Sequence, residues 1–169
     1  VRVHPAMVPD AHPLASVRDS FNAVFVEGEA VGDLMFYGRG AGGFPTASAV
    51  LGDVIDAAAN LAKGTHTSLG SFGKARIRPI DELRSAFYLN LVVEDRPGVL
   101  AAVAGVFGTH GVSIRSMEQE SLDSGDSGAR LTFITHTARE ADLRSTLGEL
   151  RGLDAVRSVG SVLRVIGSD

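Results

Sequence analysis

The sequence predicts an α+β protein, in which strands and one helix are followed by a ferredoxin-like domain with the order βαββαβ. From Ala86 onward, apolar residues alternate in some segments and recur at three- and four-residue steps in others. Residues 64–85 are rich in Gly, Ser and Thr and then basic, as expected of a linker. Residues 1–37 contain short apolar runs interrupted by Gly and Pro, which is typical of strands joined by turns. The predicted parts are therefore 1–63, 64–85 and 86–169.

The first part ends in a predicted helix from Pro45 to Lys63. Pro45 suits the first helical turn because it has no N–H group to leave unpaired, and Gly64 is well placed to end the helix. The helical spacing is carried by Ala47, Val50, Leu51, Val54, Ile55, Ala58, Leu61 and Ala62. Before this helix, the runs "VRVHPAMV", "NAVFVEG" and "GDLMFYG" predict strands.

The last part contains four predicted strands and two helices. The strands are "AFYLNLVV", "VSIRSMEQES", "RLTFITHT" and "AVRSVGSVLRVI", with a bulge expected at Gly160. The helices are "VLAAVAGVFGTH", ended by Gly111, and "AREADLRSTLGELRG", and "LDSGDSGA" predicts a hairpin loop. We expect both helices on one face of the sheet. The other face is only partly polar, which favours pairing with a partner.

Composition excludes several classes of protein. There is no Cys among the 169 residues, so disulfides and thiolate metal sites are excluded and an intracellular location fits. The net charge of −4 gives no support to a nucleic-acid or anionic-membrane role. No signal peptide or membrane span is apparent, and we expect a cytoplasmic protein. The sequence begins at Val1 without an initiator Met, which suggests a fragment or a processed chain.

A glycine motif in "YGRGAGGFPTASAV" raises the possibility of a dinucleotide site. Gly38, Gly40 and Gly43 spell G-x-G-x-x-G, with a predicted strand before and a helix after. A complete fingerprint also needs a second parallel strand that ends in an acidic residue, and here the helix leads into the linker instead. The pattern therefore favours a tight strand-to-helix turn over a cofactor contact, although free N–H groups at the helix start permit anion binding.

The segment "EDRPGVL" is a second candidate site. A strand ends at Glu94 and Asp95, Pro97 fixes a turn, and Gly98 allows close approach to the start of a helix. This arrangement offers a carboxylate to an ammonium group and backbone N–H groups to a carboxylate, as recognition of a free amino acid requires. An N-capping Asp before a Pro-initiated helix explains the same residues equally well.

Other chemistry has little support in the sequence. The five histidines, at 4, 12, 66, 110 and 136, have no metal-ligand spacing, and we expect no metal site. No nucleophile motif is present, and neither Lys63 nor Lys74 has the context of a buried acid or base. We therefore assign no catalytic residue to this chain.

Two stretches resemble known families. Residues 1–63, with "VRVHPAMVP", "HPLASV" and "YGRGAGGFPTASAVLGDVI", resemble the C-terminal part of the catalytic region of homoserine dehydrogenase. Residues 86–166, with "VVEDRPGVLAAVAGVFGTHGVSIRSM", resemble an ACT domain, a βαββαβ module that binds amino acids. The two occur in this order in bacterial homoserine dehydrogenases, so the resemblance accounts for the whole chain.

The first resemblance implies reduction of aspartate semialdehyde to homoserine with NADPH or NADH, on the route to threonine, methionine and isoleucine. It implies that Gly42 contacts the nicotinamide cofactor, with Gly40 and Thr46 as neighbours in the turn. The main dinucleotide fingerprint and the catalytic residues of the family lie upstream of Val1. We therefore expect this chain alone to be inactive, to hold no NADP or NAD, and to leave an apolar face uncovered in its first third.

The second resemblance implies an effector site, with L-threonine as the expected feedback inhibitor. Asp95 would meet the ammonium group, Gly98 and Val99 would offer backbone groups to the carboxylate, and Ser113 and Ile114 would close the site. The module would also form a homo-oligomer through sheet or helix pairing. Two alternatives are a stand-alone amino-acid sensor and an ACT dimerisation module without a ligand.

Overall fold

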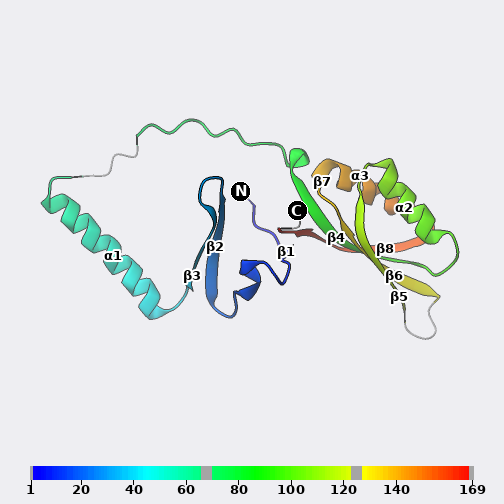
Figure 1. Cartoon of the computed structure of the whole chain (residues 1–169), viewed down its shortest axis with the longest axis horizontal. Coiled ribbons are helices and arrows are strands. Elements are labelled where there is room, and N and C mark those ends of the chain that lie inside the picture. The colour runs from blue at the N-terminus through cyan, green and yellow to red at the C-terminus, as the bar shows by residue number, and fades with distance from the viewer. Residues whose placement is uncertain (1, 66–69, 123–126, 168–169) are drawn as a thin grey trace. The chain divides into compact units, whose positions relative to one another are not determined.

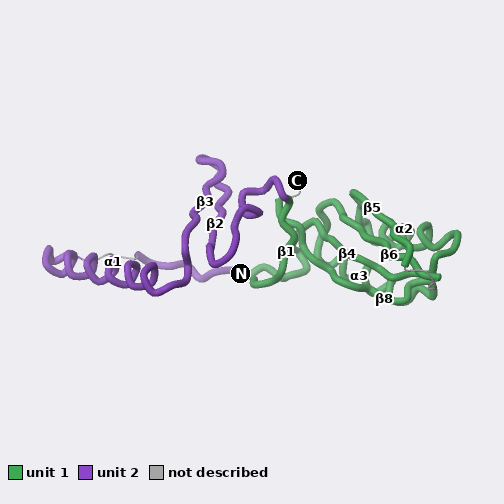
Figure 2. The backbone as a smooth tube through the Cα atoms, turned by 90° about the horizontal axis from the view of Figure 1, so that it is seen from below, with its two compact units in different colours: residues 1–9, 77–169 green, residues 10–76 purple. Residues whose placement is uncertain are grey.

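The computed structural model describes residues 2–65, 70–122 and 127–167 (Figure 1). The chain forms two compact units, coloured separately in Figure 2. Unit 1 consists of Val1–Pro9 together with Ile77–Asp169, and unit 2 is Asp10–Arg76. Unit 2 is therefore an insertion between two segments of unit 1. Parts of the predicted linker and hairpin loop, residues 66–69 and 123–126, lie outside the described residues, as does His66.

Unit 1 has the predicted βαββαβ order. Its main strands are β4 (Arg84–Glu94), β5 (Ile114–Ser121), β6 (Gly128–Thr135) and β8 (Val156–Val165). Its helices are α2 (Val99–Thr109) and α3 (Glu140–Leu150), with a short helix η2 (Ile80–Glu82) and a two-residue strand β7 (Ala138–Arg139). The strands lie in the order β8-β4-β6-β5, each antiparallel to its neighbours. This is the ferredoxin-like arrangement that the sequence predicts.

The core of unit 1 lies between the sheet and its two helices. The alternating residues of β4, Phe87, Leu89, Leu91 and Val93, are all at most 2% exposed, as predicted. They pack in one cluster with residues of the neighbouring strands and of both helices, including Val103, Phe107, Leu131, Phe133, Leu143 and Leu150. The rings of Phe107 and Phe133 lie 5.1 Å apart between centroids. Burial of this apolar area is the main source of stability of the unit.

A fifth strand extends the sheet at the β8 edge. This strand, β1 (Ala6–Met7), runs parallel to β8, with Ala6 opposite Arg164 and Met7 opposite Val165. The N–H of Ile166 donates to the carbonyl oxygen of Met7 at 2.9 Å. The run "VRVHPAMV" predicts a strand near this position, but nothing in that run indicates that the strand joins the C-terminal sheet.

The predicted bulge at Gly160 is confirmed. Leu89 lies opposite Val162, whereas Leu91 lies opposite Val159, so β8 carries one extra residue between these pairs. A Cβ atom at Gly160 would lie only 1.9 Å from Oδ1 of Asn90. Glycine at this position therefore gives the Asn90 side chain its space.

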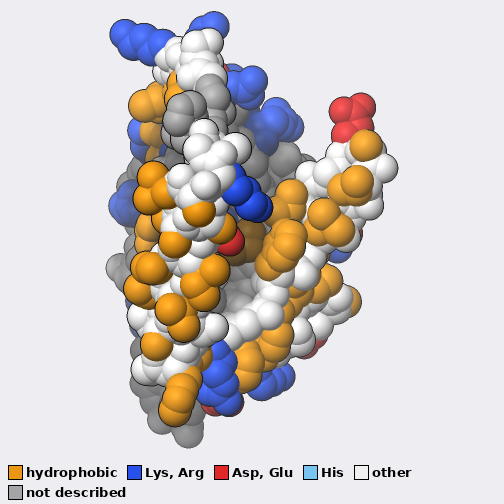
Figure 3. All heavy atoms as spheres, turned by 90° about the vertical axis from the view of Figure 1, so that its left-hand side faces the viewer, with side chains coloured by type: hydrophobic (Ala, Val, Ile, Leu, Met, Phe, Trp, Pro, Cys, Tyr) orange, Lys and Arg blue, Asp and Glu red, His pale blue; other side chains and the backbone are white. Residues whose placement is uncertain are grey.

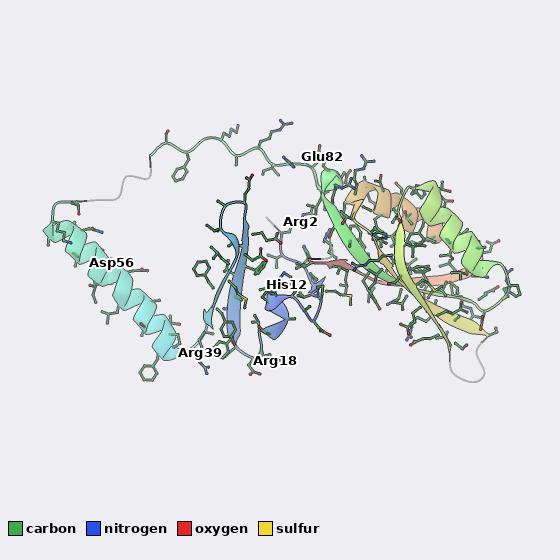
Figure 4. All side chains as sticks on the ribbon, viewed as in Figure 1. Arg2, His12, Arg18, Arg39, Asp56 and Glu82 are labelled. Carbon is green, nitrogen blue, oxygen red and sulfur yellow. The ribbon has the colours of Figure 1, made fainter. Side chains whose placement is uncertain are left out.

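Unit 2 begins with a short helix and a β-hairpin. Helix η1 (Pro13–Ser16) is followed by the antiparallel strands β2 (Phe21–Gly28) and β3 (Gly32–Arg39). The ring of Phe21 stacks on that of Tyr37 at 4.8 Å, and the guanidinium of Arg39 lies 4.7 Å from the centre of the Phe21 ring. Figure 4 shows Arg18 and Arg39 at the end of the hairpin where β2 begins and β3 ends. Aromatic and cation–π contacts therefore hold this end together.

Helix α1 (Gly43–Ala62) follows the hairpin. It begins two residues earlier than predicted, because Pro45 needs no hydrogen-bond partner anywhere in the first turn, and the first helical bond runs from Thr46 N–H to the Gly42 carbonyl at 3.1 Å. It ends as predicted, with Gly64 in the left-handed region at φ +62°. None of the helices in the described part of the chain has the length and hydropathy that crossing a membrane requires.

The apolar side of α1 is not covered. Val50, Leu51, Val54 and Ile55 are 57–59% exposed. Figure 3 shows hydrophobic side chains gathered over the side of the molecule that carries α1. The exposed face expected in the first third of the chain is therefore present in the structure.

Candidate functional site

A pocket of about 430 Å³ lies in unit 1, where β4 ends and α2 begins. It is lined by the turn Glu94–Gly98, by Val93, Val99 and Leu100 beside it, and by Gln119 and Leu131 from the neighbouring strands. The volume is within the range of small-molecule sites in proteins. Three of the five predicted effector residues, Asp95, Gly98 and Val99, lie together in this pocket.

The carboxylate of Asp95 is held at one side of the pocket. Its Oδ1 atom accepts a hydrogen bond from Nε2 of Gln119 at 3.3 Å, and its backbone N–H donates to the carbonyl oxygen of Ser127 at 2.9 Å. The backbone is thus fixed by the loop after β5, while the carboxylate keeps acceptor positions for a second donor.

Two further charges stand beside Asp95. Nε of Arg96 donates to Oε2 of Glu94 at 2.8 Å, and both side chains are exposed. The hydrogen bond from Arg96, reinforced by its charge, lowers the pKa of Glu94 below its ordinary value. Because Glu94 already accepts a hydrogen bond from Arg96, Asp95 is the better placed carboxylate for an incoming ammonium group.

The start of α2 forms the other side of the pocket. Gly98 is the N-cap residue, with φ +89°, and no side chain caps the helix. No side chain accepts from the amide groups of the first turn, and the N–H of Val99 donates to the carbonyl oxygen of Arg96 over a long 3.4 Å. A helix start of this kind favours an anion beside it. The sequence leaves an N-capping Asp open as an alternative. In the structure Asp95 does not cap the helix, because the helix begins at Val99, beyond Pro97.

Ser113 and Ile114 do not reach this pocket within one chain. Ile114 lies opposite Thr135, whereas Gln119 lies opposite Leu131, close to the end of β4. Five residues of strand separate Ile114 from Gln119, a distance of about 17 Å. The position on β5 that lines the pocket is therefore Gln119. Sequence reasoning missed it, because only the strand register shows which end of β5 lies beside Asp95.

The glycine turn of unit 2 has a different structure from a nucleotide-binding unit. Among the described residues, β3 pairs only with β2, to which it is antiparallel. No described strand after α1 pairs with β3, as a nucleotide-binding unit would require. A Cβ atom at Gly40 would lie 1.6 Å from Nδ2 of Asn22, so packing within the unit accounts for this glycine. Gly42 has φ +128° and is the N-cap of α1, again without a side-chain cap. Gly42 and Thr46 line a shallow depression that continues along the apolar side of α1.

The remaining titratable residues form no further centre. Within the described parts of the chain, no three His, Asp or Glu side chains are grouped as a metal ion would require. Nδ1 of His12 accepts a hydrogen bond from the Leu14 N–H at 3.1 Å, and Nε2 of His110 lies 2.7 Å from Oε2 of Glu149. These histidines take part in local structure.

Two family models match the chain. Residues 1–55 match the model described as homoserine dehydrogenase, and residues 87–155 match the ACT domain. The second match covers β4 from Phe87 onward, β5, β6, both helices and the pocket of unit 1, and it ends immediately before β8. The first covers β1, the hairpin and most of α1.

Curated relatives match nearly the whole chain. A homoserine dehydrogenase of Corynebacterium glutamicum is 47% identical over 97% of the chain, and one of Mycobacterium tuberculosis is 46% identical over 99%. The matches cover 36% and 39% of these relatives, so the chain spans well under half of their length. Among solved structures, a homoserine dehydrogenase from Thiobacillus denitrificans is 32% identical with a TM-score of 0.87, covering 97% of this chain and 38% of that one.

Proposed function

Because the chain belongs to the homoserine dehydrogenase family and corresponds to the C-terminal part of its members, we propose that the whole protein reduces L-aspartate 4-semialdehyde to L-homoserine with NADPH or NADH. Its pathway would supply threonine, methionine and isoleucine. The support is the match to relatives of that name along nearly the whole chain. We assign no catalytic residue to this chain and expect it to be inactive alone.

Unit 2 would contribute to the cofactor site of the whole protein. The turn before α1 fits such a role, because Gly42 has no side chain, lies at an uncapped helix start and adjoins Thr46 in an open depression. A bound nicotinamide cofactor would supply the hydride. The backbone at Gly42 and the hydroxyl of Thr46 would help to position it, while Gly40 keeps the turn packed on β2. The rest of the catalytic region would cover the apolar side of α1.

Unit 1 would sense an amino acid, with L-threonine as the proposed effector. The observation that carries this proposal is the pocket in which the Asp95 carboxylate lies beside the uncapped start of α2. The ammonium group would bind Asp95, and the carboxylate would accept from the amide groups at Gly98 and Val99. The amide of Gln119, already bonded to Asp95, would be the donor nearest to the ligand side chain.

A second copy of the chain would complete this pocket. Among the described strands, β5 pairs only with β6, so its other edge is open. If two β5 edges pair antiparallel, the start of one strand lies beside the end of the other. Ser113 and Ile114 of a second copy would then approach the first copy's Gln119, which is how they would close the site.

Calorimetry with threonine and a panel of other amino acids tests the effector proposal. We expect threonine to bind and Asp95→Asn to weaken binding by roughly ten- to a hundredfold, because a charged hydrogen bond contributes about 1.5–3 kcal/mol. Asp154→Asn, an exposed carboxylate of unit 1 outside the pocket, is the matched control and should leave binding unchanged. In the whole enzyme, Asp95→Asn should relieve inhibition by threonine without lowering the uninhibited rate.

Other outcomes would favour the two alternatives. No binding at millimolar threonine or any amino acid, with dimers still present, would indicate a dimerisation module without a ligand. A reading frame that starts with Met immediately before Val1 would indicate a stand-alone sensor and contradict the dehydrogenase proposal.

A further inference from the structure

A second groove in unit 1 runs along α3, away from the pocket at Asp95. Its volume is about 570 Å³. One wall is formed by one side of α3, which contributes Glu140, Leu143, Arg144, Leu147 and the C-cap residue Arg151, so it extends over the whole helix, about 16 Å. The other wall is formed by Val162–Arg164 of β8 and by His4 and Pro5, with Ile80 from η2. The groove shares no lining residue with the pocket at Asp95.

The floor of the groove is apolar. Phe87 and Leu143, which are 1% and 2% exposed, lie at its base, and the partly buried Leu147 and Val162 pack against the same core. A ligand in this groove would therefore place an apolar body against the core of the unit, which contributes about 25 cal/mol for each Å² of apolar area removed from water.

The charges of the groove leave one cation free. Arg164 donates from Nε and Nη2 to both carboxylate oxygens of Glu140, at 2.7–3.1 Å, with both side chains less than 20% exposed. Arg144 pairs with Asp81. The guanidinium of Arg151, the C-cap residue of α3, has no hydrogen-bond or ion-pair partner among the described residues.

We propose that this groove binds a small organic monocarboxylate with a branched apolar body, whose carboxylate pairs with Arg151. The lining carries three arginines and a single carboxylate, Glu140, in a chain whose net charge is −4. Glu140, the single carboxylate of the lining, is already paired with Arg164, so its charge is neutralised and it attracts an ammonium group less strongly than Asp95 does. The groove therefore selects against amino acids, which the pocket at Asp95 is built to accept, and it is independent of the threonine proposal.

A ligand there would also contact the segment that leads into β1. His4 and Pro5 line the groove, and the next two residues, Ala6 and Met7, pair with β8. A ligand between α3, β8 and this segment would stabilise the β1–β8 pair. The amide of Ile166, which donates to Met7, should then exchange its hydrogen more slowly.

NMR titration of the 169-residue chain with 4-methylpentanoate tests the proposal. We expect shifts of the amide signals of Arg151, Val162 and Leu163, slower exchange at Ile166, and no such changes with the neutral 4-methylpentanamide at equal concentration. Threonine should shift signals around Asp95 instead. Arg151→Gln should weaken binding of the carboxylate about tenfold.

The matched control is Arg96→Gln, which removes an equal charge beside the other pocket and should leave carboxylate binding unchanged. Three results would overturn the proposal: no shifts at 10 mM carboxylate (about the weakest affinity such a site would have), equal binding of the acid and the amide, or shifts confined to the Asp95 pocket. Equal weakening by the two Arg variants would also contradict it, because it would indicate a general effect of charge.

Discussion

The two units have similarly regular patterns of apolar residues, but only unit 1 buries the residues of its pattern. In unit 1 the apolar faces of β4, α2 and α3 close on one another, and residues such as Leu89 and Val103 are fully buried. In unit 2 the apolar stripe of α1 has equally regular spacing, yet Val54 and Ile55 remain more than half exposed. A periodic pattern thus specifies which side of a helix is to be buried. It does not specify whether the covering surface lies in the same chain.

The largest expected contrast between the units comes from removing one aromatic ring. Phe133→Ala should lower the free energy of unfolding of unit 1 by about 3–5 kcal/mol, because Phe133 is fully buried against Phe107. Phe44→Ala, at a position that is 92% exposed in unit 2, should change stability by less than about 0.5 kcal/mol. Urea denaturation of both variants measures the difference, and comparable losses would contradict the contrast.

The same Gly→Ala change should have opposite signs in the two units. Gly160→Ala should destabilise unit 1 by roughly 1–3 kcal/mol, since its Cβ would collide with Asn90. Gly52→Ala, inside α1 with no atom within 4 Å of the new Cβ, should stabilise the helix by about 0.5–1 kcal/mol. Thermal unfolding of unit 1 and the helical circular dichroism signal of α1 measure the two effects. Combining Gly160→Ala with Asn90→Ala should recover most of the loss, and no recovery would contradict the steric explanation.

A third comparison sets this chain against the whole protein. Val54→Ser should leave the present chain unchanged within about 0.5 kcal/mol, because the side chain is already exposed. In the whole protein it should cost roughly 1–2 kcal/mol if the catalytic region covers α1. Asp56→Ser, on the same helix (Figure 4), is the control and should be neutral in both. Equal thermal stability of the two variants in the whole protein would show that α1 stays uncovered there.

The smallest expected effect concerns charge on the surface of unit 1. Arg96→Gln should raise the pKa of Glu94 toward its ordinary value of 4.5, because the hydrogen bond that lowers it is lost. A lowered pKa stabilises the folded state above pH 4.5, and this contribution is lost as pH falls through the folded pKa. Carboxyl NMR titration checks the pKa. A large stability change at pH 7 would contradict the view that burial, and not exposed ion pairs, distinguishes unit 1.

Local patterns predict most of unit 1. The alternation from Phe87 to Val93 identifies the buried face of β4, and Gly111 and Gly160 occupy a helix end and a bulge, as expected. These features depend on neighbours in sequence. The pairing of β1 with β8 joins residues about 160 positions apart, and two residues of strand carry no signal for their partner.

In the candidate site, too, features that depend on neighbours in sequence can be predicted, whereas contacts between distant residues cannot. The turn from Asp95 to Val99 can be predicted, because strand end, Pro, Gly and helix start follow one another in sequence. Gln119 cannot, because its position beside Asp95 depends on the register of β5 against β6, which shifts between Ile114 and Ser116. Ser113 and Ile114 remain a prediction that requires a second copy.

The parallel pairing of β1 with β8 bears on how this protein can be divided. Because residues 1–9 and 77–169 share one sheet, cleavage within residues 64–85 would not release that sheet intact. A fragment starting at Ile77 would present the outer edge of β8 to solvent, and an unpaired edge invites association with other chains. Conversely, the 67 residues of unit 2 are joined at both ends to unit 1, so removing them takes two cuts and separates β1 from the chain that carries β8.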